Sequence, residues 1–105
     1  MKTIVVVALL LTAAGSALAQ SPSASVVERG ETAFKKNGCY GCHIIGKFGT
    51  PIGPNLSQVG RTYTPEYLAR WLRDPALQRP HAHMPALELT EEDVRTLAEY
   101  LGSLR

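Results

Sequence analysis

Two cysteines and a histidine stand within five residues of one another, in the order Cys39-Tyr40-Gly41-Cys42-His43. The 105-residue sequence has no other cysteine. Thiols at this spacing can each add to one of the two vinyl groups on one edge of a porphyrin, and the next imidazole then reaches the iron. The motif therefore predicts covalent attachment of one haem c. Cys39 and Cys42 would be the thioether anchors, and His43 the proximal axial ligand.

Three other kinds of site compete for the same residues. A redox dithiol of the thioredoxin kind needs a preceding strand and a βαβ unit, which no alternating or β-branched run supplies. A zinc site needs a second pair of ligands, and His81 and His83 are too close together to match the usual spacing of zinc-binding histidines. A disulfide between Cys39 and Cys42 would close a very small loop and stabilise little. Haem attachment is the favoured interpretation.

A low-spin haem that transfers electrons needs a second axial ligand, and the segment 80–85 contains three candidates. Met84 is the only methionine besides the initiator. It lies between two prolines and two predicted helices, which suits a ligand that approaches the iron from the face opposite His43. We expect His43 and Met84 to bind the iron. His81 and His83 are expected to be exposed loop residues, with a histidine as the alternative to Met84.

The first nineteen residues have the pattern of a secretory signal. Lys2 is followed by an apolar run, Ile4–Leu11, and by small residues that end at Ala19. The run is shorter than the roughly 20 residues that a membrane span needs, so cleavage after Ala19 is favoured over a retained anchor. We expect residues 1–19 to be a cleaved signal peptide and residues 20–105 a single domain. The protein is then periplasmic or otherwise extracytoplasmic.

Three later segments combine helical periodicity with a residue that can cap a helix. The predicted N-caps are Ser25, which begins a capping box, Thr64 and Thr90. The first helix should stop at Asn37-Gly38, and the second at Asp74 because Pro75 follows it. Between these two helices, residues 44–63 are rich in glycine and proline, and we expect a long loop that serves a site. The predicted fold class is all-α, with three main helices and long loops wrapped around one haem.

Charge narrows the range of partners. The formal net charge of +2 is too small to suggest nucleic-acid binding. Basic residues predominate in the half that carries the cysteines, and acidic residues predominate after Pro80. Lys35, Lys36 and Lys47 lie near the cysteines in the sequence, where they would attract an acidic redox partner or, alternatively, only keep the protein soluble. No acid–base pair or nucleophile stands out, so the sequence indicates neither an enzyme nor a small-molecule substrate.

The chain resembles small monohaem class I cytochromes c of bacteria. The resemblance rests on the cysteine motif and then, in order, on Gly53-Pro54-Asn55-Leu56, Trp71-Leu72-Arg73-Asp74-Pro75 and Met84-Pro85. It implies a cytochrome c-like fold in which Gly30 allows the last helix to approach the first. It further implies that the Pro54 carbonyl accepts a hydrogen bond from His43, that Arg61 contacts a haem propionate and that Trp71 lies against the haem.

The expected function is extracytoplasmic electron transfer, with single electrons shuttled between respiratory partners by one haem with His/Met ligation. The alternative is an electron-entry subunit permanently docked in a larger oxidase or dehydrogenase, which an exposed apolar patch would favour. An enzyme or gas sensor would require that Met84 leave the iron open. The expected partners are redox proteins or membrane-bound respiratory complexes, with the chain either a monomer or a subunit.

Overall fold

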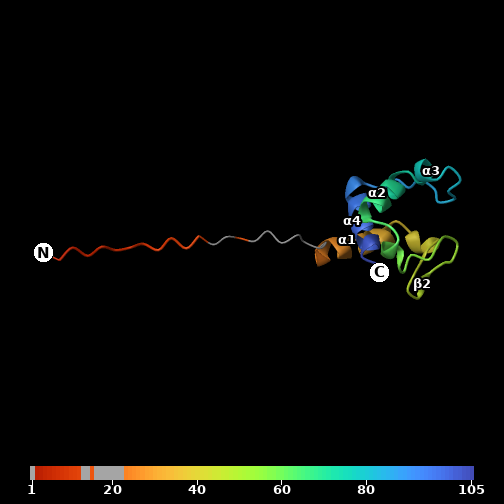
Figure 1. The fold of residues 1–105 in the computed structure, drawn as a ribbon. Coiled ribbons are helices and arrows are strands. Elements are labelled where there is room, and N and C mark those ends of the chain that lie inside the picture. The colour runs from red at the N-terminus through yellow and green to blue at the C-terminus, as the bar shows by residue number, and fades with distance from the viewer. Residues whose placement is uncertain (1, 13–14, 16–22) are drawn as a thin grey trace.

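The first and last helices cross at the centre of the fold (Figure 1). The computed structural model describes residues 2–12, 15 and 23–105. Helix α1 spans Ala24–Lys36 and helix α4 spans Glu91–Gly102. A Cβ atom added at Gly30 would overlap the carbonyl oxygen of Thr96 and the Cβ of Tyr100, so only glycine permits this approach. The close contact expected at Gly30 is confirmed.

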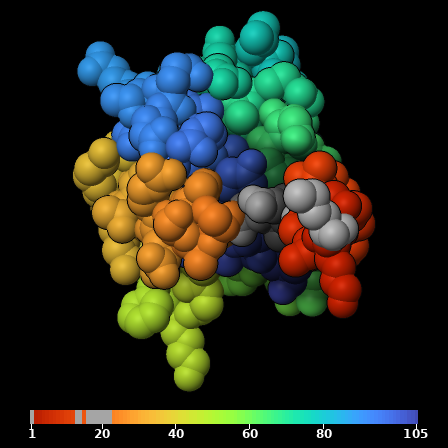
Figure 2. Space-filling model, turned by 90° about the vertical axis from the view of Figure 1, so that its left-hand side faces the viewer, coloured from red at the N-terminus to blue at the C-terminus, as the bar shows by residue number. Residues whose placement is uncertain are grey.

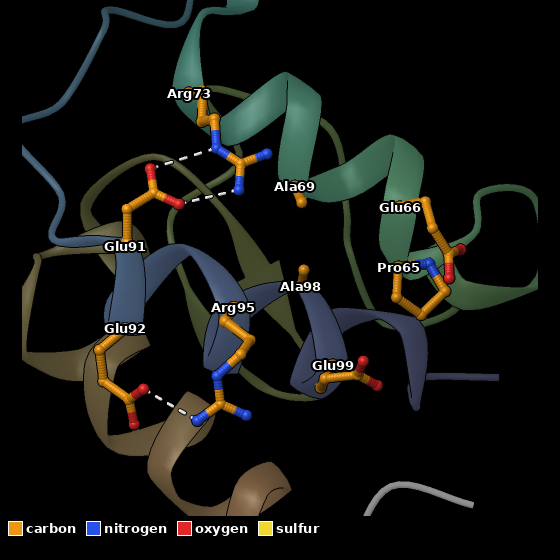
Figure 3. A pocket seen from close by; sticks show the side chains of 9 residues that line it. All are labelled: Pro65, Glu66, Ala69, Arg73, Glu91, Glu92, Arg95, Ala98 and Glu99. Carbon is orange, nitrogen blue, oxygen red and sulfur yellow. Dashed lines mark hydrogen bonds and ion pairs between the residues drawn. The ribbon is translucent and has the colours of Figure 1, made fainter.

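Helix α2, Pro65–Arg73, packs on α4 and completes the core. Besides Pro75, which follows α2, the buried apolar side chains come from these three helices and are Ala33, Phe34, Leu68, Leu72, Val94, Leu97, Ala98, Tyr100 and Leu101. Figure 3 shows the outer side of the α2–α4 contact, where Ala69 faces Ala98 and the Arg73 guanidinium binds Glu91 at 2.9 and 3.2 Å. Small residues therefore bring α2 and α4 close together, and their larger apolar side chains point to the other side.

Two predicted helix starts are confirmed and one is wrong. The hydroxyls of Thr64 and Thr90 accept the backbone N–H groups of Tyr67 and Asp93, at 3.2 and 3.0 Å. Helix α1 instead begins at Ala24, so Ser25 lies within the first turn and cannot be the N-cap. Its hydroxyl lies 3.1 Å from that of Ser23, which occupies the N-cap position.

The segment 44–63 is more ordered than a plain loop. Strands β1, Ile44–Ile45, and β2, Phe48–Gly49, form a short antiparallel hairpin, and a 3-10 turn, η2, spans Val59–Arg61. A further 3-10 turn, η1, covers Cys39–Gly41. The sequence did not predict this hairpin, because strands of two residues are too short to show an alternating pattern.

A short helix that the sequence did not predict follows α2. Helix α3, Pro75–Gln78, begins directly after Asp74, whose carboxylate accepts the N–H of Leu77 at 3.3 Å. Pro75 ends α2, as expected, and also opens α3, because proline is favoured at a first helical position. The chain turns at Asp74 and continues towards the segment that contains Met84.

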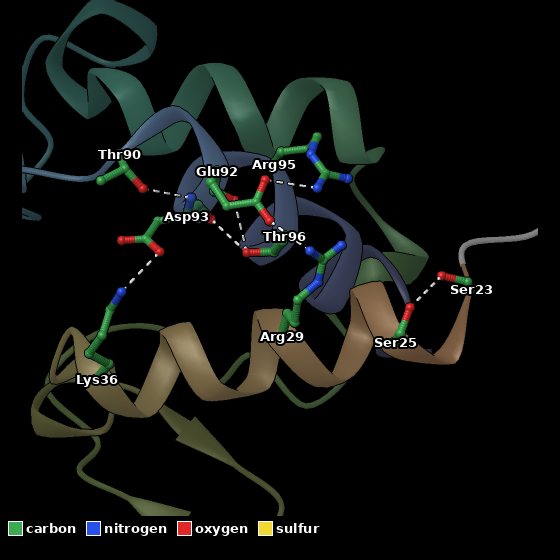
Figure 4. A network of polar contacts seen from close by, with 9 residues as sticks. All are labelled: Ser23, Ser25, Arg29, Lys36, Thr90, Glu92, Asp93, Arg95 and Thr96. Carbon is green, nitrogen blue, oxygen red and sulfur yellow. Dashed lines mark hydrogen bonds and ion pairs between the residues drawn. The ribbon is translucent and has the colours of Figure 1, made fainter.

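A polar cluster joins the end of α1 to the start of α4 (Figure 4). The buried Asp93 carboxylate accepts hydrogen bonds from Lys36 at 3.2 Å and from the Asn37 amide at 3.5 Å. Nearby, Glu92 binds both Arg29, at 3.0 Å, and Arg95, at 2.8 Å. The Asp93 contacts are the more protected, because both arginine pairs are about half exposed to solvent.

Gly30→Ala should destabilise the fold, because the added methyl group meets backbone atoms of α4 that cannot move aside independently. Overpacking of this kind costs about 1–3 kcal/mol. Thermal unfolding measures the loss, with Gly41→Ala as the control because an added Cβ there meets nothing within 4 Å. Equal melting temperatures for the two variants would contradict the crossing at Gly30.

Asp93 should make stability depend on pH. Burial raises the pKa of its carboxyl, but hydrogen bonds from Lys36 and Asn37 outweigh that effect, so the net pKa lies below its ordinary value. A lowered pKa adds stability above the unfolded-state value, about 3.9, and that stability is lost as the pH falls through the folded-state value. Asp93→Asn should therefore unfold more easily than wild type at neutral pH, with a difference that shrinks in acid.

Urea unfolding at several pH values tests this dependence. Glu88→Gln, at an exposed position before α4, is the control and should keep the wild-type profile. A difference between wild type and Asp93→Asn that persists unchanged in acid would show that the carboxylate is not the source of the stability.

Candidate haem-binding site

A cavity of about 1250 Å³ opens between α2, α4 and the loops before and after α2. It is larger than most ligand pockets, which measure roughly 300–1,000 Å³. The walls are mainly apolar, and the helices contribute Phe34, Tyr67, Leu68, Trp71, Leu72, Leu97 and Leu101. The apolar side chains of α2 therefore line a cavity as well as the core.

The four site residues singled out in the sequence all line this cavity. Cys39, Cys42 and His43 reach it from η1 and the residues just after it, and Met84 reaches it from the segment after α3. The N–H of His43 donates to the Cys39 carbonyl at 2.9 Å, which makes the motif one tight turn. Two thiols, an imidazole and a thioether thus converge on one apolar space from positions far apart in the chain.

The imidazole of His43 is held in one orientation by its surroundings. Its Nδ1–H donates to the Pro54 carbonyl at 2.7 Å, as the resemblance implied, which leaves the lone pair of Nε2 available for a metal. Gly53 packs against the ring, since an added Cβ would lie 2.7 Å from His43 Cε1. Gly53 is fixed in turn by its N–H, which donates to the Cys42 carbonyl at 2.6 Å.

The environment of Cys39 argues against a redox dithiol. Burial is the largest effect on this half-buried thiol and raises its pKa above the ordinary value, and a smaller rise comes from the neighbouring Cys42. Redox-active cysteines of dithiol motifs instead have lowered pKa values, because the thiolate is the reactive form. A neutral thiol that faces an apolar cavity suits an anchoring role.

Met84 is positioned by a contact that sequence reasoning missed. The indole N–H of Trp71 donates to the Met84 sulfur, with 3.2 Å between Nε1 and Sδ. The resemblance placed Trp71 against the haem without naming this partner. The sequence does show an aromatic residue, Trp71, in the second predicted helix. A separation of thirteen residues does not by itself show that its side chain meets that of Met84.

The other residues singled out lie around the opening. Arg61, His81 and His83 also line the cavity, and all three are exposed. The exposed positions predicted for both histidines are confirmed. Among residues 2–12, 15 and 23–105, no group of three or more His, Cys, Asp or Glu side chains is arranged to hold a metal ion.

The sequence model of the family Cytochrome c matches residues 27–105. The chain belongs to the cytochrome c family. The match includes the motif, the loop that carries Pro54, helix α2 and Met84. Together with the helical architecture, it establishes an all-α, cytochrome c-like fold.

Curated relatives include subunits of respiratory complexes. Cytochrome c oxidase subunit 2 of Alkalihalophilus pseudofirmus is 33% identical over 99 residues, which cover 86% of this chain and 29% of the relative. The same subunit of Bacillus sp. PS3 is 33% identical, over 76% of this chain and 26% of the relative. A nitric oxide reductase subunit of Halomonas halodenitrificans is 33% identical, over 71% of this chain and 56% of the relative. The chain thus spans less than a third of either oxidase subunit.

Family membership identifies the cofactor as covalently bound haem c. The residues of the cavity fit that cofactor. The space is large and mainly apolar, it has both thiols at its wall, and it presents an oriented imidazole and a thioether sulfur.

Gly53→Ala should disturb the site more than the fold. The added methyl group would push the imidazole of His43 away from the Pro54 carbonyl, because it meets the ring at 2.7 Å. Nuclear magnetic resonance of the reduced protein should show displaced His43 ring signals and a broadened or lost Nδ1–H signal. Wild-type positions for both signals in Gly53→Ala would contradict the packing described here.

Proposed function

We propose that the chain is an extracytoplasmic single-electron carrier in which Cys39 and Cys42 anchor haem c through thioether bonds and His43 and Met84 bind its iron. The observation that supports this assignment is the convergence of all four side chains on one apolar cavity. Bound haem c supplies a one-electron couple there, so the chain itself needs no acid, base or nucleophile.

The residues around the cavity would adjust the reduction potential of the haem and shield it from water. The Pro54 carbonyl orients His43 and makes its imidazole a stronger donor. A thioether such as Met84 raises a haem potential relative to a second histidine. The hydrogen bond from Trp71 withdraws electron density from the sulfur, which adds to the same effect. Apolar walls exclude water and so favour the form with less charge.

The extracytoplasmic location rests on the signal pattern and on the chemistry of attachment. Lys2 and the apolar run Ile4–Leu11 lie in the described residues, whereas the cleavage site after Ala19 lies outside them. No helix in the described parts of the chain is both long and apolar enough to cross a membrane. We propose residues 1–19 as a cleaved signal peptide and residues 20–105 as one cytochrome c domain.

A permanently docked electron-entry subunit is the second candidate, which exposed apolar side chains outside the cavity, Phe48 and Leu77, favour. Phe48, at the hairpin, is 73% exposed and does not line the cavity. Figure 2 shows the hairpin region, in yellow-green, projecting from the body of the domain. The relatives named as subunits of an oxidase and a nitric oxide reductase also favour a docked role.

The charges near the motif give less support for an acidic partner than the sequence indicates. Lys35 pairs with Glu31 at 3.4 Å, and Lys36 pairs with Asp93 at 3.2 Å. Of the three lysines near the cysteines, Lys47 alone has no ion pair among the described residues. A docking partner would therefore meet one unpaired lysine, Lys47, which precedes the exposed Phe48 in the sequence.

Expression with a c-type haem maturation system tests the proposed function. The purified chain should have the mass of residues 20–105 plus one haem that acid acetone does not extract, and its oxidised form should show the sulfur-to-iron charge-transfer band of methionine ligation. A haem that acid acetone extracts would refute the thioether anchors. Migration of native protein as a single small species supports the carrier, and a stable large complex supports the docked subunit.

Trp71→Phe should lower the midpoint potential, because the Met84 sulfur loses its hydrogen bond and donates more strongly to oxidised iron. A hydrogen bond worth about 0.5–1.5 kcal/mol corresponds to roughly 20–60 mV for one electron. Spectroelectrochemical titration measures the shift. Tyr67→Phe, which changes another ring in the cavity wall, is the control, and equal potentials for both variants would mean that Trp71 does not act through the sulfur.

A further inference from the structure

The segment that carries Met84 contains two kinds of side chain that can bind iron, a thioether and two imidazoles. His81 and His83 are exposed, whereas Ala82 and Met84 are half-buried. Both histidines nevertheless line the mouth of the cavity together with Met84. His83 directly precedes Met84, in a segment that turns at Pro80 and His81 and bends at Met84, so a shift of one residue along the chain moves the imidazole towards the place of the thioether. An imidazole thus lies one residue from the thioether.

Little holds this segment in its present register. Of the backbone N–H groups in residues 80–88, all of which the structure describes, only that of Ala82 donates within the chain, to the Arg79 carbonyl at 3.0 Å. Among side chains, the contact from Trp71 to Met84 holds the segment, and neither imidazole has a hydrogen-bond partner in this part of the chain. When the Met84 sulfur is not held, a shift of this segment by one residue breaks very few hydrogen bonds.

We propose that His83 is a second distal ligand, held in reserve, which binds the iron when Met84 does not. This inference rests on the proposed ligation by His43 and Met84. A one-residue shift moves the chain by about 3.8 Å and brings His83 to the place of Met84. His81 would need a shift of three residues and lies directly after Pro80, whose ring restricts the backbone. The neutral imidazole offers a ring nitrogen to the iron.

Binding of His83 would keep the iron closed to small molecules when Met84 is not bound. An iron with an empty sixth position can bind small molecules, which is a property of enzymes and gas sensors rather than of carriers. With His83 in place, the iron keeps two protein ligands and the site stays closed to small molecules. The chain then remains an electron carrier at a lower potential, because histidine in place of methionine lowers it.

Replacing Met84 tests the proposal directly. Met84→Leu keeps the side-chain volume and Met84→Ala removes it, and covalent attachment through the cysteines keeps the haem in both. The oxidised variants should be low-spin by electron paramagnetic resonance, without the sulfur-to-iron band, and their reduced forms should bind carbon monoxide slowly. Adding His83→Ala should make the iron high-spin and carbon monoxide binding fast, and free imidazole should restore the low-spin signal.

Adding His81→Ala to the same Met84 variants is the matched control, and it should leave them low-spin. High-spin iron in both single Met84 variants would overturn the proposal, as would a low-spin signal that is lost with His81→Ala and kept with His83→Ala. The wild-type spectrum tests ligation by Met84 separately from the reserve role of His83. A missing sulfur band in the wild type refutes Met84 as the ligand, whereas a present band with high-spin Met84 variants refutes only the reserve role of His83.

Discussion

The cavity of about 1250 Å³ is the constraint on which the rest of the structure depends, because a small domain cannot leave so large an apolar space unfilled. Helices α1 and α4 cross as closely as Gly30 allows and form a core on one side of the space. Helix α2 closes another side. Covalently bound haem c in this cavity would complete the core, so that one cofactor would provide both the redox couple and much of the apolar burial.

The loops carry the side chains that would hold that cofactor. Tight turns set the two thiols and His43, and the Pro54 carbonyl then fixes the imidazole at 2.7 Å. On the opposite side, Met84 depends on a single donor, Trp71, and lies in a segment with few backbone bonds. The side of the cavity that carries His43 is therefore held by several contacts and the side that carries Met84 by few, and under the proposed ligation Trp71 and the segment around Met84 would adjust the potential.

Local signals in the sequence predict the parts of the fold that short-range chemistry determines. The haem motif needs only five consecutive residues, and threonine caps and prolines locate two of the helix starts. The prediction of Ser25 as a cap is wrong, because Ser23 and Ser25 offer the same chemistry two residues apart. Contacts between distant segments, such as Trp71 with Met84, depend on how the helices pack and have no signature in the sequence. The convergence of Met84 on the motif could be predicted from its loop position, but not its hydrogen bond.

X-ray absorption at the iron edge of the reduced protein tests the central claim most directly. The proposed ligation predicts a single sulfur neighbour from Met84 together with nitrogen neighbours from the porphyrin and His43. The same measurement on Met84→Leu should lose the sulfur and show nitrogen in its place, from His83. A wild-type spectrum that needs only nitrogen or oxygen neighbours would contradict the account of this site.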